Sequence, residues 1–104
     1  MTTTIIRNGL FFDGTGKKGR KADVVIQEGK VAAVHNQAPA IEGAKEIDAT
    51  GKWVTPGFID IHTHYDAEIE VMPGLEEALR HGTTTVVMGN CSISAALGKD
   101  EDIV

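Results

Sequence analysis

Three side chains in this sequence, two histidines and one cysteine, are of the types that bind transition metals. His62 and His64 are two residues apart in an apolar stretch, Phe58 to His64, that is typical of a β-strand. Side chains alternate along a strand, so both imidazoles are expected on the same face, with their Cβ atoms roughly 6.5–7 Å apart. Zinc–imidazole bonds are about 2.0–2.1 Å long, which allows both rings to converge on one ion.

The cysteine follows a second β-branched stretch. Thr83 to Met88 predicts a strand, and Cys91 comes shortly after its end. If the two strands are parallel neighbours, their carboxyl ends meet at one edge, and the thiol lies beside the His-x-His pair. Two imidazoles and a thiolate are typical zinc ligands. Asp60 shares the histidine face and is a candidate to accept a hydrogen bond from the second nitrogen of a histidine.

Other interpretations stay open on the residues alone. His-x-His is short enough to arise by chance on a half-exposed strand. A free cysteine is often a small, inert, buried residue. Cys91 with a histidine also fits a catalytic nucleophile, although no residue is identified that would orient the base. Tyr65 and Asp66 open an expected loop, residues 65–73, where an acidic residue fits either substrate contact or a solvated surface.

The elements that must position these residues form a strand–helix–strand unit. Leu75, Ala78 and Leu79 make one apolar stripe, which predicts a helix over Leu75 to His81. Gly82 suits the left-handed position that often follows a helix end. Strands joined by a helical crossover are parallel. Parallel strands are also what would bring their carboxyl ends, and therefore the histidines and the cysteine, to one edge.

The first half of the chain predicts a small β-sandwich built from short strands between glycine-containing turns. Asn8-Gly9 and Glu28-Gly29 are both predicted to be tight turns between antiparallel strands. The strands expected here are Thr3 to Arg7, Leu10 to Phe12, Ala22 to Gln27, Lys30 to His35 and Lys45 to Ala49.

Composition excludes several classes of protein. The 104 residues include 10 Lys and Arg against 15 Asp and Glu, a formal net charge of −5, which disfavours nucleic-acid binding. No apolar run approaches the ~18 residues of a membrane span. One cysteine cannot form an internal disulfide, so the expected location is the cytoplasm. A (β/α)8 barrel needs ~250 residues, so a chain that ends at Val104 is expected to be a piece of a longer polypeptide.

At these residues the sequence resembles a known family. Pro56 to His64 looks like the first barrel strand of the metal-dependent amidohydrolase superfamily, and residues 8–31 resemble its N-terminal β-sandwich. Within the superfamily, His64-Tyr65-Asp66-Ala67 and His81 to Cys91 are most similar to the N-acyl-D-amino-acid deacylases, or D-aminoacylases. The resemblance implies a mainly β chain with one βαβ unit. Residues 1–54 would form part of the sandwich, and residues 55–104 the first two strands and first helix of a truncated (β/α)8 barrel.

The resemblance also implies a zinc enzyme with one or two ions. His62 and His64 would hold one zinc, and Cys91 would bind the other or bridge the two. Tyr65 and Asp66 would lie near the substrate. The implied reaction is hydrolysis of the amide of a small-molecule N-acyl-D-amino acid by metal-activated water, releasing a carboxylate and a free D-amino acid.

In such a family the general base and two further histidines lie outside this chain, so it holds no catalytic residue of its own. The isolated piece is therefore expected to be inactive, to bind zinc weakly, and to self-associate through exposed strand edges. Two alternatives remain. One is another amidohydrolase reaction, of the dihydroorotase, hydantoinase or deaminase type, and the other is a non-catalytic β-rich module.

Overall fold

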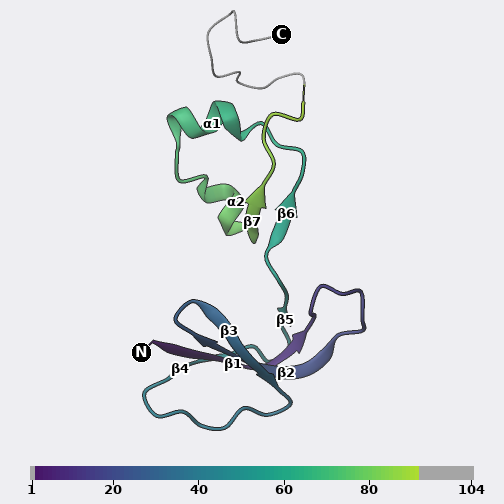
Figure 1. Ribbon diagram of the computed structural model, residues 1–104, viewed down its shortest axis with the longest axis vertical. Helices are drawn as coiled ribbons and strands as arrows, with labels where there is room; N and C mark the ends of the chain where they lie inside the picture. Colours follow the sequence, from purple (N-terminus) through teal and green to yellow (C-terminus); the bar gives the residue numbers. More distant parts are fainter. Residues whose placement is uncertain (1, 92–104) are drawn as a thin grey trace, which may run out of the picture. The chain divides into compact units, whose positions relative to one another are not determined.

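A computed structural model of the chain describes residues 2–91 and divides the chain into two compact units (Figure 1). The first unit runs through Pro56 and the second begins at Gly57. The fold is mainly β, with two short helices confined to the second unit. No helix in the described part of the chain is long and apolar enough to cross a membrane.

The first unit is built on one five-stranded sheet (Figure 1). Four of the strands are arranged in the order β3-β2-β1-β4, and the fifth, β5, pairs with β1. The long central strand β1 is antiparallel to β2 and parallel to both β4 and β5. The strands are β1 (Thr3–Phe11), β2 (Arg20–Gln27), β3 (Lys30–His35), β4 (Lys45–Asp48) and β5 (Trp53–Val54). The described residues of this unit form a single sheet, so a second layer of a sandwich stays a prediction.

The predicted hairpin at Glu28-Gly29 is confirmed. Gln27 pairs with Lys30, which leaves a two-residue loop between β2 and β3. Both loop residues have positive φ, 52° at Glu28 and 77° at Gly29. Positive φ at both central positions matches the right-handed twist of the flanking strands, which is why this short loop closes the hairpin.

The predicted turn at Asn8-Gly9 is wrong, because β1 continues through it as one strand. Asn8 has a φ of 63°, and the register of β1 against β2 shifts between Ile6 and Gly9, so the pair forms a β-bulge. The backbone N–H of Asn8 bonds to Oδ1 of Asp23 at 2.8 Å. A Cβ on Gly9 would collide with Val54, so the glycine permits close approach of β5.

The core of the first unit lies on one face of this sheet. Ile5 and Val25 are paired across β1 and β2, and both are buried. Ala38, from the loop between β3 and β4, packs against them, so this face is covered by the loop rather than by a second sheet. On the opposite face, apolar side chains including Ile6, Val24 and Phe11 line an open hollow of about 340 Å³.

A buried carboxylate ties the sheet to that loop. Asp23 on β2 is only 4% exposed and accepts hydrogen bonds from the backbone N–H groups of Asn8 and Ala38, the latter at 2.9 Å. Nη1 of Arg7 on β1 lies 3.2 Å from the same carboxylate, and Nη2 of Arg7 bonds to Glu46 on β4 at 2.5 Å. Burial by itself raises the pKa of Asp23. The three donors outweigh burial, so the pKa of this carboxyl lies below its usual value.

The second unit contains the predicted parallel strand pair and one helix that was not predicted. It comprises β6 (Phe58–Asp60), α1 (Tyr65–Val71), α2 (Glu76–Arg80) and β7 (Thr83–Val86). β6 and β7 are parallel neighbours, as the strand–helix–strand pattern predicted. The loop expected over residues 65–73 contains α1, which has Asp66 and Glu68 in its first turn, where the helix dipole favours negative charge. Whether this unit is a barrel segment stays a prediction.

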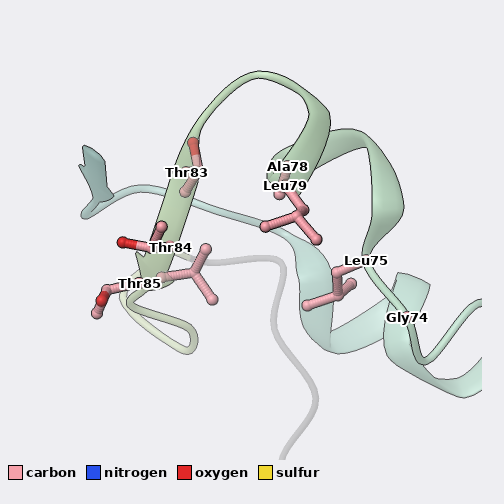
Figure 2. A pocket seen from close by; sticks show the side chains of 8 residues that line it. Gly74, Leu75, Ala78, Leu79, Thr83, Thr84 and Thr85 are labelled. Carbon is pink, nitrogen blue, oxygen red and sulfur yellow. The ribbon is translucent and has the colours of Figure 1, made fainter. Parts of the chain in front are cut away.

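Helix α2 packs on β7 and leaves an open hollow of about 260 Å³ beside the strand (Figure 2). Leu75 and Leu79 line it from the helix side, and residues of β7 line it from the strand side. Of the helical stripe, only Ala78 is buried, and Leu79 is 66% exposed. The hollow is lined by apolar and threonine side chains, without any acid, base or metal ligand.

Removing the Asp23 carboxylate should destabilise the first unit strongly. In Asp23→Ala, two backbone N–H groups lose their acceptor and the Arg7 guanidinium loses one of its three acceptors, which we expect to cost on the order of 2–4 kcal/mol in urea unfolding. Glu46→Ala is the matched control, since it removes the exposed partner of the same arginine and should cost much less. Equal losses in both variants would contradict a central role for Asp23.

The same carboxylate should make stability depend on acid. Because the folded pKa of Asp23 lies below its unfolded value, its contribution is fully present above about pH 4 and is lost as pH falls through the folded pKa. The unfolding midpoint of the wild-type chain should therefore drop more steeply below pH 4 than that of Asp23→Asn. Parallel pH profiles would show that the buried carboxylate is not the group responsible.

Candidate metal centre

Two imidazoles and a thiol converge in the second unit. One ligand atom from each of His62, His64 and Cys91 can be chosen so that all lie within 4.8 Å of one another. Both histidines are exposed, and the cysteine is half-buried. The structure thus brings together the three residues that the sequence singled out, although they are up to 29 positions apart in the chain.

Parallel strand pairing explains this convergence. β6 ends at Asp60 and β7 ends at Val86, two residues that are paired with each other. Both strands run in the same direction, so the segments that leave them emerge at the same edge. His62 and His64 follow the end of β6, and Cys91 follows the end of β7.

The histidines are not on the strand itself, which corrects the sequence-based prediction that β6 would run to His64. They lie in a bend between β6 and α1, and strict alternation therefore does not apply to them. Their ring centroids are nevertheless 5.7 Å apart, with the ring planes inclined at 59°.

Asp60 has a different contact from the one predicted. Its Oδ1 accepts a hydrogen bond from the backbone N–H of His62 at 3.1 Å, so the carboxylate stabilises the bend, and its predicted bond to an imidazole nitrogen stays a prediction. Tyr65 and Asp66 form the start of α1, directly after His64, and both are half-buried. Asp60 therefore contacts the histidine bend, and Tyr65 and Asp66 follow it directly in the sequence.

Sequence reasoning missed two residues that join the histidine segment to the cysteine segment. Thr63 donates its hydroxyl to the carbonyl of Val87 at 2.8 Å, and Asn90 donates its side-chain amide to the carbonyl of Ile61. The only sequence signal was adjacency, since Thr63 stands between the two histidines and Asn90 immediately precedes Cys91.

The donor set fits a borderline or soft divalent cation. Imidazole nitrogen and thiolate sulfur suit zinc and its neighbours, whereas calcium and magnesium prefer oxygen ligands. Three protein ligands leave a fourth position for another group, as in catalytic zinc sites. His81, which lies at the end of α2, is outside the cluster and is 3.8 Å from Glu77 instead.

The chain is similar to known proteins over most of its length. It is 54% identical over 99 residues to an uncharacterized protein of Mycobacterium tuberculosis, covering 94% of this chain and 16% of that one. It is 42% identical over 92 residues to N-acyl-D-glutamate deacylase of Alcaligenes xylosoxydans xylosoxydans, covering 88% of this chain and 19% of the relative.

A solved structure shows the same likeness in three dimensions. N-acyl-D-glutamate deacylase from Bordetella bronchiseptica, in complex with zinc and a phosphonate inhibitor that mimics the tetrahedral intermediate, is 41% identical. The TM-score is 0.76, and the match covers 89% of this chain and 19% of that enzyme.

The chain therefore spans less than a fifth of the length of these relatives. The profile of the Amidohydrolase family matches residues 45–102, which include the end of the sheet unit, both strands of the second unit and all three candidate ligands. With over half of its length matched in this way, the chain belongs to the amidohydrolase family.

Proposed function

We propose that the protein carrying this chain is a zinc-dependent hydrolase that cleaves the amide of N-acyl-D-amino acids, with His62, His64 and Cys91 among its metal ligands. The observation that carries this proposal is the grouping of the three donor atoms within 4.8 Å at the ends of two parallel strands. The carboxyl ends of parallel strands are where α/β enzymes bind ligands and perform chemistry.

The substrate class is supported by the relatives. Both deacylases described above act, by name, on N-acyl-D-glutamate, and one of them is bound to zinc. The similarity to these enzymes includes the segments that carry the candidate ligands. The resemblance of the segment His81 to Cys91 to the D-aminoacylases led us to expect this. The acidic amino acid of those substrates is not carried over, because this chain spans only 19% of those enzymes.

A bound zinc ion would supply Lewis-acid chemistry, activating a water and polarising the amide carbonyl. Within this chain, the two imidazoles and the thiolate would hold and orient the ion, and Asp60 stabilises the bend that presents His62. Tyr65 and Asp66 begin α1 directly after His64, and we propose that they contact the substrate. The general base lies outside these residues, so we propose that the 104-residue chain alone is inactive.

Metal binding should depend on the cluster and not on His81, the exposed histidine at the end of α2. We expect His64→Ala and Cys91→Ser each to weaken zinc binding at least about 10-fold in calorimetric titration, since each removes one ligand. His81→Ala, an exposed histidine outside the cluster, is the matched control and should bind like the wild type. Binding that is equal in all four proteins would remove the proposed site.

Activity should require the rest of the enzyme. The intact protein is expected to release free amino acid from N-acetyl-D-amino acids but not from their L-enantiomers, and chelation of the metal should abolish turnover. Residues 1–104 alone should show none, because they lack the base. Hydrolysis of dihydroorotate or deamination of a purine, with no action on N-acyl-D-amino acids, would instead favour another reaction of the family.

A further inference from the structure

The backbone ladder between β6 and β7 stops before it reaches the metal ligands. Its last paired residues are Asp60 and Val86, and one further backbone bond follows, from the N–H of Val87 to the carbonyl of Asp60 at 2.8 Å. Beyond this point the two segments separate into a bend before α1 on one side and a loop on the other. All three candidate ligands lie beyond the last paired residues of the ladder.

Two side chains continue the connection where the ladder ends. The hydroxyl of Thr63 bonds to the carbonyl of Val87 at 2.8 Å, and the amide of Asn90 bonds to the carbonyl of Ile61. Each bond crosses from one ligand segment to the other, and they cross in opposite directions. We refer to Thr63 and Asn90, with these two bonds, as the clasp.

The members of the clasp differ in burial. Thr63 is 5% exposed, so water has little access to its hydroxyl and competes weakly with the bond to Val87. Asn90 is exposed and can be changed with little effect on packing. Thr63 separates the two histidines in the sequence, and Asn90 directly precedes Cys91, so movement of either residue moves a ligand.

The donor atoms of His62, His64 and Cys91 must be held close together if a metal ion is to bind them readily. Tetrahedral bonds of about 2.0–2.3 Å place ligand atoms roughly 3.5 Å apart, so atoms that now lie within 4.8 Å need to close by only about 1 Å. Without a link past the end of the ladder, the exposed imidazoles and the thiol would sample wider separations. Ordering these side chains around the ion would then cost free energy and lower the affinity for the metal.

We propose that Thr63 and Asn90 are positioning residues for the metal centre, which hold the imidazole segment against the thiol segment before the ion binds. This inference rests on the proposed metal site and adds to it a cause for its preorganisation. The clasp acts through the backbone of the ligand segments, without touching the ion.

The test compares cobalt binding by clasp variants of the intact protein. The absorption band of a thiolate–cobalt bond reports Cys91 directly, and its loss in Cys91→Ser assigns it. Thr63→Val keeps the side-chain shape and removes the hydroxyl, while Asn90→Ala removes the amide. Each should weaken cobalt binding about 10-fold or more, as is usual when a supporting hydrogen bond is lost. Thr63→Ser restores the hydroxyl and should recover most of the affinity.

Thr85→Val on β7 is the matched control, since this exposed threonine lines the hollow beside α2 and has no part in the clasp (Figure 2). It should bind cobalt like the wild type. Amide hydrogen exchange of the metal-free protein provides a second readout, and Thr63→Val should speed exchange at Val87, whose N–H continues the ladder.

The outcomes separate the two proposals. Wild-type affinity and unchanged exchange in Thr63→Val and Asn90→Ala would overturn the clasp and leave the metal site standing. Absence of any Cys91-dependent band in the wild type would overturn the metal site and, with it, the positioning role of Thr63 and Asn90. If Thr63→Val fails to fold, the exposed Asn90→Ala variant decides, and wild-type binding by it overturns the proposal.

Discussion

The parallel pairing of β6 with β7 is the constraint on which the candidate site depends. Only three residues of β6 and four of β7 take part, yet their common direction places the segments after Asp60 and Val86 at one edge. An antiparallel pair would send those segments to opposite ends of the strands and separate the histidines from the cysteine. The grouping of the three donor atoms in the second unit therefore depends on strand direction more than on burial in a core.

The two units achieve order by different means. In the first, Asp23 is buried and holds together β1, β2 and the loop before β4, while the loop residue Ala38 completes the core. In the second, only Ala78 and Thr63 are buried among the described residues, and apolar side chains such as Phe58 and Ile61 are more than half exposed. Local hydrogen bonds thus carry much of the order around the ligands, which is where the Thr63 and Asn90 contacts act.

Several features were predictable because they depend on residues that are close in sequence. The Glu28-Gly29 hairpin follows from the backbone angles that a two-residue loop requires, and the helix α2 follows from its apolar stripe. Asn8-Gly9 carries the same local signal as a hairpin turn but forms a bulge, because Asp23 and Val54, both distant in sequence, fix its place in a continuous strand. A local turn signal does not distinguish a hairpin loop from a β-bulge, because each of them needs a residue with positive φ.

The sequence by itself determined the ligand types, their grouping after two strands, and the family that this pattern resembles. Tertiary structure decided how His62 and His64 face one another, since they lie in a bend held by Asp60 and not on a strand. It also decided that Thr63 and Asn90 join the two ligand segments. The physical reason is that residue type and order set which atoms can coordinate a metal, whereas the distance between them depends on hydrogen bonds spanning more than 20 residues.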